Sequence, residues 1–427
     1  MDFVYLSAMK KIVAILLLFP AFFYAQGVQK KIKVLFLGNS YTYVNNLPQL
    51  VYNIALANGD TLVFDSNLIG GYTLNNHFND ALSLSKINAA GWDFLVLQAQ
   101  SQEPSFPPAQ VNAQTLPYAL KLDSAFKQNN PCATTVFYET WGRKYGDASN
   151  CGAYPPVCTY TGMQDRLKQS YKNFAFSCQG VMAPAGEAFR ASIAANPSLE
   201  LYDPDQSHPS INGSYLAAAV FYETLFRKSV SGNTFNPGLA VNTLTFLQQT
   251  AHATVHDSLA AWYLGVNFPW AGFITNSSGP LNYQFQGQSP ALTNSWYFGD
   301  GGLSSLPAPA HIYGSAGNYT VSHVVTKGCK KDSAIHVISM TPSGLPAYDA
   351  APALQIYPSP CADRLYISGA AFDAGTAAME LCDASGRLLY RAAFTRELST
   401  ADLKNGLYFL KVFHQSGTVC LRFVKNE

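Results

Sequence analysis

Charged side chains are scarce in this chain. Asp, Glu, Lys and Arg make up 12% of its 427 residues, and the formal net charge is only +1. Globular domains average about 25% charged residues, and nucleic-acid binding usually requires a basic excess that is missing here. Hydrophobic residues reach 48% and aromatic residues 13%, which excludes a disordered chain or a coiled coil. The composition therefore predicts a folded protein of about three domains with no nucleic-acid partner.

Cysteine pairs with the spacing of a zinc site are also absent, so no metal is expected. The chain holds eight cysteines, an even number that suits disulfide formation in an oxidising compartment. We expect at least one disulfide among the first four; for the last four, pairing and burial as free thiols are equally open. In chain order they are Cys132, Cys151, Cys158, Cys178, Cys329, Cys361, Cys382 and Cys420.

No apolar run is long enough to cross a bilayer as a helix, which takes about 20 residues. The first run, residues 12–24, follows Lys10 and Lys11 and ends at the small residue Ala25. This layout predicts a secretory signal peptide over residues 1–25. We therefore expect an exported protein without a transmembrane segment in its mature form.

Residues 28–265 alternate short apolar runs with helical periodicity, which predicts an α/β domain: a parallel sheet between two helical layers. A helix is expected around Leu47 to Ala55, and the last two over Ser214–Phe226 and Leu239–Tyr263. The predicted strands are Lys33–Leu37, Thr61–Phe64, Asp93–Leu97, Thr134–Tyr138 and Val181–Ala183.

Two small all-β regions are expected after this domain. Residues 266–340 contain short β runs separated by Gly, Asn, Ser and Pro, which is typical of an antiparallel sandwich. Residues 341–352 contain Pro342 and Pro346 and are predicted to be a linker. Six short strands are expected in residues 353–427.

Candidate catalytic residues lie in the first domain. Ser40 follows the first predicted strand and precedes a helix, where free backbone N–H groups can stabilise a developing anion. Asp205 and His208 are three residues apart in a turn-rich segment, so a carboxylate can orient an imidazole toward Ser40. The alternative is that Ser40 is a helix cap and that Asp205 and His208 belong to a solvated loop.

Four short motifs together resemble the conserved blocks of the SGNH (GDSL-like) hydrolases. They occur in the order of that family and are residues 38–42 (GNSYT), 70–72 (GGY), 96–101 (VLQAQS) and 205–209 (DQSHP). The resemblance implies that Ser40 is the nucleophile, His208 the general base and Asp205 its carboxylate partner. It also implies an oxyanion hole formed by the backbone N–H groups of Ser40 and Gly71.

The third block departs from the family, which usually has an asparagine there. Gln100 is the first choice for the remaining oxyanion donor, with Gln98 as the alternative and as a substrate-binding candidate. The first block has Asn39 where better-known members have aspartate. Trp141 could present a flat face to a sugar ring, or belong to the core, and His77 could line the same cleft.

His252 and His256 are four residues apart on a predicted helix, as zinc ligands often are, but no third ligand is apparent in the sequence. We interpret them as ordinary residues of the helix surface.

The two tail regions resemble known modules. Residues 296–301 (WYFGDG), 309–313 and 317–321 resemble a PKD domain, an immunoglobulin-like sandwich whose aromatic residues we expect in the core. Residues 356–360, 383–387, 403–408 and 422–425 resemble the C-terminal sorting domain of the type IX secretion pathway of Bacteroidetes. That resemblance implies export across the outer membrane by the type IX secretion machinery, to the cell surface or the medium.

The resemblances together imply a secreted serine esterase that needs no cofactor and acts on acyl esters, for example O-acetyl esters, of a polysaccharide or glycan. Two alternatives stay open. One is a non-catalytic glycan-binding or adhesin-like protein on the same scaffold, and the other is a lipase or thioesterase with a wide apolar cleft.

Overall fold

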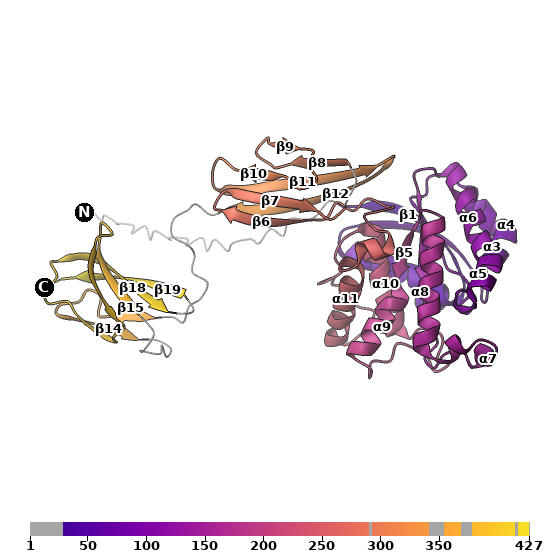
Figure 1. Ribbon diagram of the computed structural model, residues 1–427, viewed down its shortest axis with the longest axis horizontal. Helices are drawn as coiled ribbons and strands as arrows, with labels where there is room; N and C mark the ends of the chain where they lie inside the picture. Colours follow the sequence, from indigo (N-terminus) through magenta and orange to yellow (C-terminus); the bar gives the residue numbers. More distant parts are fainter. Residues whose placement is uncertain (1–28, 290–292, 341–353, 369–377, 415–416, 427) are drawn as a thin grey trace, which may run out of the picture. The chain divides into compact units, whose positions relative to one another are not determined.

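The computed structural model describes residues 29–289, 293–340, 354–368, 378–414 and 417–426 (Figure 1). The predicted signal peptide and linker lie outside these residues. The described chain forms two compact units, residues 1–342 and 343–427, and the first unit contains both the α/β domain and the first β-sandwich.

The α/β domain is built on a five-stranded parallel sheet with the strand order β2-β1-β3-β4-β5. All five predicted strands are confirmed. The central strands β3 and β4 are buried along their whole length, as expected for a sheet covered on both faces. The strands are β1 (Lys31–Gly38), β2 (Thr61–Leu68), β3 (Phe94–Leu97), β4 (Thr134–Glu139) and β5 (Val181–Pro184).

Helices cover both faces of this sheet (Figure 1). The α-helices are α1 (Ser40–Tyr43), α2 (Leu47–Ala57), α3 (Leu74–Asn79), α4 (Ala81–Asn88), α5 (Pro108–Gln114), α6 (Leu116–Asn129), α7 (Ala148–Cys151), α8 (Tyr160–Ser177), α9 (Ala185–Ala195), α10 (Ile211–Phe226) and α11 (Val241–His256). Short 3₁₀ turns are η1 (Val44–Asn46), η2 (Glu103–Ser105), η3 (Pro155–Cys158) and η4 (Leu259–Trp262).

The strand order fixes where a site can form. The chain steps from β1 to β2 in one direction across the sheet and then from β2 to β5 in the other. Right-handed crossovers therefore place α2 on one face and α4, α6 and α8 on the opposite face. The connections after β1 and β3 diverge at the carboxyl ends of these strands, which leaves the crevice where open α/β sheets hold their ligands.

Helix α10 is the most deeply buried helix of the domain, and every residue from Gly213 to Phe226 is buried. It packs against α2, α9 and α11, which explains why most of its residues are apolar whichever side they face. The predicted helix over Leu239–Tyr263 is shorter than expected. Helix α11 ends at His256, and Ser258 has non-helical backbone angles (φ −142°, ψ 31°) before a separate 3₁₀ turn begins at Leu259.

The first β-sandwich has two antiparallel sheets, with the orders β10-β7-β6 and β12-β11-β8-β9. Trp296 and Phe298 are each only 1% exposed and contact a core of aromatic residues, as predicted. The strands are β6 (Phe273–Gly279), β7 (Asn282–Gly287), β8 (Thr293–Tyr297), β9 (Leu303–Ser304), β10 (Ala310–Ile312), β11 (Gly317–Lys327) and β12 (Lys330–Met340).

Covalent and ionic contacts join this sandwich to the α/β domain. A disulfide links Cys132 to Cys329. Asp332 of the sandwich is buried and forms ion pairs with Lys30 at 2.6 Å and with Arg227 at 2.9 Å. The buried carboxylate of Asp332 therefore has two cationic partners, so its negative charge is not left uncompensated.

The C-terminal unit also contains two antiparallel sheets, with the orders β13-β14-β17 and β16-β15-β18-β19. It has its own core around Leu365, Leu381 and Leu410. Seven strands are described where the sequence predicted six: β13 (Gln355–Tyr357), β14 (Arg364–Ser368), β15 (Ala378–Asp383), β16 (Leu388–Ala393), β17 (Glu397–Ser399), β18 (Gly406–His414) and β19 (Gly417–Lys425).

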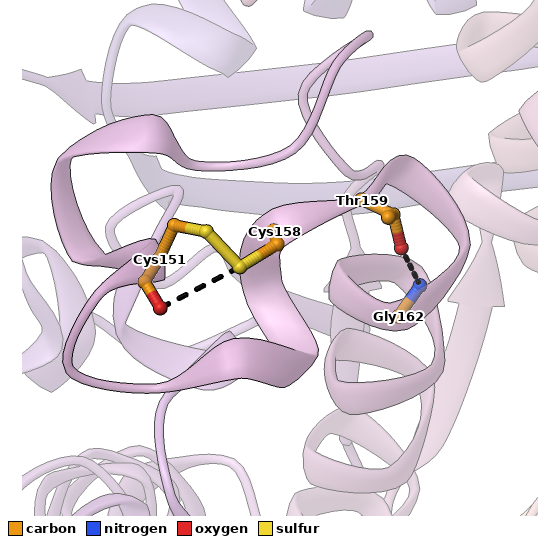
Figure 2. The surroundings of a disulfide bond; sticks show 4 residues. All are labelled: Cys151, Cys158, Thr159 and Gly162. Atoms are coloured by element: carbon orange, nitrogen blue, oxygen red, sulfur yellow. Dashed lines mark hydrogen bonds between the residues drawn. A yellow bond between two sulfur atoms is a disulfide. The ribbon is translucent and has the colours of Figure 1, made fainter.

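The expected disulfide among the first four cysteines is confirmed, since Cys151 pairs with Cys158 (Figure 2). The partner of Cys132 comes from the second group of four, which sequence spacing could not indicate. Cys178, Cys361 and Cys382 are buried free thiols, and Cys420 is exposed. Among the described helices, none is both long enough and apolar enough to cross a membrane.

Candidate active site

Ser40 lies at the carboxyl edge of the sheet, in the first turn after β1. Asn39 caps the short helix α1, because its side-chain oxygen accepts the backbone N–H of Tyr41 at 3.2 Å. The Asn39 amide also donates to the carbonyl of Tyr72 at 2.9 Å. An aspartate at this position could accept from Tyr41 but could not donate to Tyr72, so the asparagine ties the Ser40 turn to the turn at residues 70–72.

Asp205 and His208 lie in the loop between α9 and α10. The backbone N–H of Asp203 donates to the carbonyl of His208 at 2.8 Å, and that of Gln206 donates to the carbonyl of Asp203 at 2.9 Å. These bonds close the loop on itself, with Gln206 at a positive φ of 61°. The loop delivers the carboxylate and the imidazole together, immediately before α10.

The structure brings Ser40, Asp205 and His208 together. His208 Nε2 lies 2.8 Å from Ser40 Oγ, although the two residues are 168 positions apart in the sequence. His208 Nδ1 forms a hydrogen bond with Asp205 Oδ2. An ionised carboxylate can only accept, so Nδ1 carries the proton and Nε2 is left to accept the hydroxyl proton of Ser40.

Hydrogen bonds keep Asp205 in its ionised form. Burial by itself raises the pKa of Asp205, but the bonds from the His208 ring and from the backbone N–H groups of His208 and Ser207 outweigh it and lower the pKa below its ordinary value. The Asp205 side chain is 48% exposed and that of His208 is 33% exposed. The carboxylate and the imidazole are therefore open to solvent, and Ser40 is partly exposed beside them.

Tyr41 and Trp141 hold the loop that carries Asp205 and His208 by hydrogen bonds to Ser207. Tyr41 Oη forms a hydrogen bond of 2.6 Å with Ser207 Oγ, and the Trp141 indole N–H donates to the Ser207 carbonyl at 3.0 Å. The prediction that Trp141 presents a face to a sugar ring is wrong. Its exposed fraction is 0%, and its ring stacks on Tyr41 and on Phe189. Trp141 is the core residue of the alternative interpretation.

His77 does not line a cleft, contrary to its prediction. It is fully buried, with Nδ1 2.8 Å from Ser83 Oγ and Nε2 3.1 Å from the carbonyl of Gly38. Burial lowers its pKa to about 4, so the ring is neutral at ordinary pH. His77 supports the end of β1 from inside the protein.

Gln98 is also buried, which contradicts its prediction as a substrate-binding or oxyanion residue. Its side-chain oxygen (Oε1) accepts the backbone N–H of Asn39 at 2.9 Å and the hydroxyl of Thr42 at 3.0 Å. Its side-chain nitrogen (Nε2) donates to the carbonyl of Ala99. Gln98 connects β3 to the Ser40 turn and fixes the position of that turn.

Gly71 and Gln100, the two other oxyanion candidates, have accessible positions. Gly71 is exposed at a positive φ of 72°, with open space where a Cβ would lie. The side-chain oxygen of Gln100 (Oε1) accepts the backbone N–H of Gln102 at 2.8 Å. Its side-chain nitrogen (Nε2) has only longer contacts, at 3.4 Å to Ser101 Oγ and 3.3 Å to Gln102 Oε1. The amide of Gln100 is therefore only weakly held.

A network beside the site was not anticipated from the sequence. Asp147 is fully buried and accepts hydrogen bonds from Arg143 at 3.2 Å and Gln102 at 2.8 Å. The Cys151–Cys158 disulfide closes the segment that follows Asp147, and the Val157 carbonyl in that segment accepts the backbone N–H of Asp147 at 2.7 Å. The cap of α8, where Gly162 donates to Thr159, comes next in the chain (Figure 2). The sequence predicted a disulfide from its cysteines, but no sequence pattern indicates that an aspartate in a loop is buried.

The prediction that His252 and His256 are ordinary residues of the helix surface is wrong. Both contact Glu223, which is fully buried in α10. The third group was missed because it lies on a different helix, 29 residues before His252.

Two segments of the chain match known families. Residues 277–341 match the PKD domain, and residues 355–426 match the secretion system C-terminal sorting domain. The second match indicates export by the type IX pathway to the cell surface or the extracellular space. Among curated proteins, no sequence matches this chain.

Several solved structures resemble the α/β domain. A DUF4886 family protein from Bacteroides uniformis is 19% identical, with a TM-score of 0.46, over 53% of this chain and 96% of that one. A candidate SGNH hydrolase from Slackia heliotrinireducens is 28% identical, with a TM-score of 0.38, over 46% and 99%. A catalytic mutant of an acetylxylan esterase from Geobacillus stearothermophilus is 15% identical, with a TM-score of 0.32, over 45% and 94%. All three TM-scores lie below 0.5.

Proposed function

We propose that this protein is an exported serine ester hydrolase with Ser40 as nucleophile, His208 as general base and Asp205 as the carboxylate that orients His208. The observation that carries the proposal is the 2.8 Å contact between His208 Nε2 and Ser40 Oγ. Nucleophile and base at hydrogen-bonding distance, with the base oriented by a third group, are the arrangement that activates a serine hydroxyl.

The reaction follows from this geometry. His208 Nε2 takes the Ser40 proton as Oγ forms a bond to the carbonyl carbon of the ester. The tetrahedral intermediate then collapses, the bond to the alcohol breaks, and His208 returns its proton to the leaving oxygen. Water, deprotonated by the same imidazole, releases the acid from Ser40. The step uses no cofactor.

The negative oxygen of the tetrahedral intermediate needs donors. We assign them to the backbone N–H groups of Ser40 and Gly71 and to the Gln100 amide. Two observations support this assignment: Gly71 is exposed, and the Gln100 amide has only long hydrogen-bond contacts. Loss of one such donor typically costs about 10² to 10³ in rate.

An acyl ester on a polysaccharide or glycan is the substrate class that we propose, with O-acetyl as the leading example. The support is the export signal and the exposure of the site, since an open surface site admits a polymer chain. The network of Arg143, Asp147 and Gln102 beside it is polar, whereas a lipase would need an extended apolar surface for its acyl chain.

The decisive test is turnover of p-nitrophenyl acetate by the wild type and by Ser40→Ala. We expect the variant to lose at least about 10³-fold in kcat/KM. Ser198→Ala is the matched control, because Ser198 is an exposed serine of the same domain that bonds only to neighbouring Asn196. Equal rates for wild type and Ser40→Ala, with both variants folded by circular dichroism, would refute the triad.

The substrate class requires a second measurement. Release of acetate from acetylated xylan and other acetylated polysaccharides should occur with the wild type and not with Ser40→Ala. Binding of these polymers without any acetate release would instead favour the non-catalytic glycan-binding alternative.

A further inference from the structure

A second cluster of histidine and carboxylate groups lies at the far end of helix α10. Glu223 is in the last turn of α10, and His252 and His256 are one turn apart on α11. Glu223 is twelve residues beyond the first residue of α10, which corresponds to about 18 Å along the helix. The cluster is therefore separate from the Ser40 site, which lies at the opposite end of α10.

The ligand-type atoms of this cluster converge on one point. Glu223 Oε2 lies 3.2 Å from His252 Nδ1 and 3.2 Å from His256 Nε2. All three ligand atoms lie within 4.8 Å of one another. In a tetrahedral zinc site with bonds of about 2.0 to 2.1 Å, neighbouring ligand atoms are about 3.3 Å apart, so this spacing matches two edges of the tetrahedron.

The carboxylate is already oriented for this role. Glu223 is fully buried, and its other oxygen, Oε1, accepts the backbone N–H of Val230 at 2.7 Å. That bond fixes the carboxylate plane, with Oε2 3.2 Å from a nitrogen of each imidazole. His252 Nδ1 also lies 3.0 Å from Oε1 and 3.1 Å from Ser229 Oγ. A buried carboxylate between two imidazoles is a set of ligands that divalent transition ions prefer.

The contact between His256 and Glu223 does not have the geometry of a hydrogen bond. The Nε2 atom of His256 is buried and lies 3.2 Å from Glu223 Oε2, but it forms no hydrogen bond with acceptable angles. Buried polar atoms are almost always satisfied, so an unsatisfied imidazole nitrogen facing a carboxylate points to a ligand. His256 also lines a cavity of about 500 Å³, together with Ser229 and Trp270, which provides an entry path and room for a water as fourth ligand.

Two carboxylates offset part of the positive charge of the three cations that line the same cavity. Lys228 contacts Asp60 at 2.6 Å, and Lys30 and Arg227 share Asp332. The charge of Glu223 therefore stays available to the two histidines.

We propose that Glu223, His252 and His256 form a binding site for one divalent transition ion of the zinc type, which joins α10 to α11. With three protein ligands from two helices, the ion crosslinks the buried central helix to the last helix of the domain. The site is structural and does not depend on the esterase proposal.

The test is zinc titration of the full chain, prepared without a polyhistidine tag and stripped with a chelator that is then removed. Calorimetry should show one zinc ion per wild-type chain and no comparable binding of Mg²⁺, which prefers oxygen ligands. His252→Gln and His256→Gln should each weaken zinc binding at least about tenfold. Zinc should also raise the melting temperature of the wild type but not that of the double variant.

The matched control is His311→Gln, because His311 also contacts a carboxylate, that of Asp300, but has no second histidine beside it. This variant should bind zinc as the wild type does. Absence of stoichiometric zinc binding by the wild type would overturn the proposal, as would equal affinity in the folded double variant. Turnover of p-nitrophenyl acetate, measured in parallel, tests the esterase proposal separately.

Discussion

The two ends of helix α10 carry the same residue types in opposite environments. Before its first residue, His208 pairs with Asp205, whose side chain is 48% exposed, and contacts a serine hydroxyl. In its last turn, Glu223 is 0% exposed and contacts two imidazoles, and the only hydroxyl in contact with them in the described chain, that of Ser229, lies 3.1 Å from the same His252 nitrogen that already faces Glu223. An imidazole beside a carboxylate is therefore not a function in itself, because the third group and the solvent decide what the pair can do.

The two ends differ in whether the carboxylate is exposed, as in Asp205, or buried, as in Glu223. A solvated carboxylate stays ionised at little cost and can orient an imidazole that must gain and lose a proton in each turnover. A buried carboxylate needs permanent positive partners, since an uncompensated buried charge is destabilising by several kcal/mol. The first end is thus suited to catalysis, and the second to structure.

Asp205→Asn should have the largest effect and should act on turnover alone. An amide in place of the carboxylate can donate to His208 Nδ1 and so favours the tautomer that cannot accept the Ser40 proton. We expect kcat to fall about 10⁴-fold while the melting temperature is unchanged. Asp203→Asn, in the same loop, is the control, and a loss below tenfold for Asp205→Asn would show that the pairing is not used in catalysis.

Glu223→Gln should show the reverse pattern. It removes the buried charge between two imidazoles and should lower the free energy of unfolding by about 3 to 4 kcal/mol, with kcat/KM unchanged. Denaturant unfolding measures this effect. Asp165→Asn removes an exposed partner of Arg190 and should cost less than about 1 kcal/mol. If the Glu223→Gln protein were as stable as the wild type but had reduced turnover, the structural role assigned to this end of α10 would be contradicted.

His77→Gln tests an imidazole with no carboxylate in contact. Burial lowers the pKa of His77 from 6.5 to about 4, so the unfolded chain binds this proton at a higher pH than the folded protein does. Stability is therefore lost as the pH falls from about 6.5 to about 4, by about 2 to 3 kcal/mol. The free energy of unfolding, measured across this pH range, should depend less on pH for His77→Gln than for the wild type. The same pH dependence in both proteins would contradict the conclusion that His77 is buried in its neutral form.

Tyr41→Phe should have the smallest effect. It removes the 2.6 Å bond to Ser207 Oγ, which precedes His208, but leaves the ring stacked on Trp141. We expect a loss of about 1 kcal/mol, or about fivefold in kcat/KM. Tyr43→Phe, on the exposed side of the same turn, should behave as the wild type; equal activity of Tyr41→Phe would show that this bond does not position the loop.

Much of the fold could be predicted because it depends on local patterns. Apolar runs bounded by turn residues identified all five strands of the parallel sheet, and alternation with helices identified the layers. The error at α11 was also local, since no proline or glycine marks the break after His256. The antiparallel character of the two tail regions followed from their turn-rich β runs.

Burial of individual side chains could not be predicted in the same way. Trp141, His77 and Gln98 lie next to the Ser40 turn in space, but they point into the protein. Whether a polar side chain near a site faces a ligand or supports the backbone depends on packing from several elements, which no short segment encodes. For the same reason, the third group of the His252 and His256 cluster was not found.

The sequence by itself determined the element order, the turn that carries Ser40 and the loop that holds Asp205 close to His208, because each depends on residues within a few positions of one another. Only the tertiary structure decided that Ser40 and His208 meet across 168 positions, that Cys132 pairs with Cys329, and that Glu223 lies between two histidines. The physical reason is that these contacts join separate elements, so they exist only once the sheet and helix α10 have packed into one core.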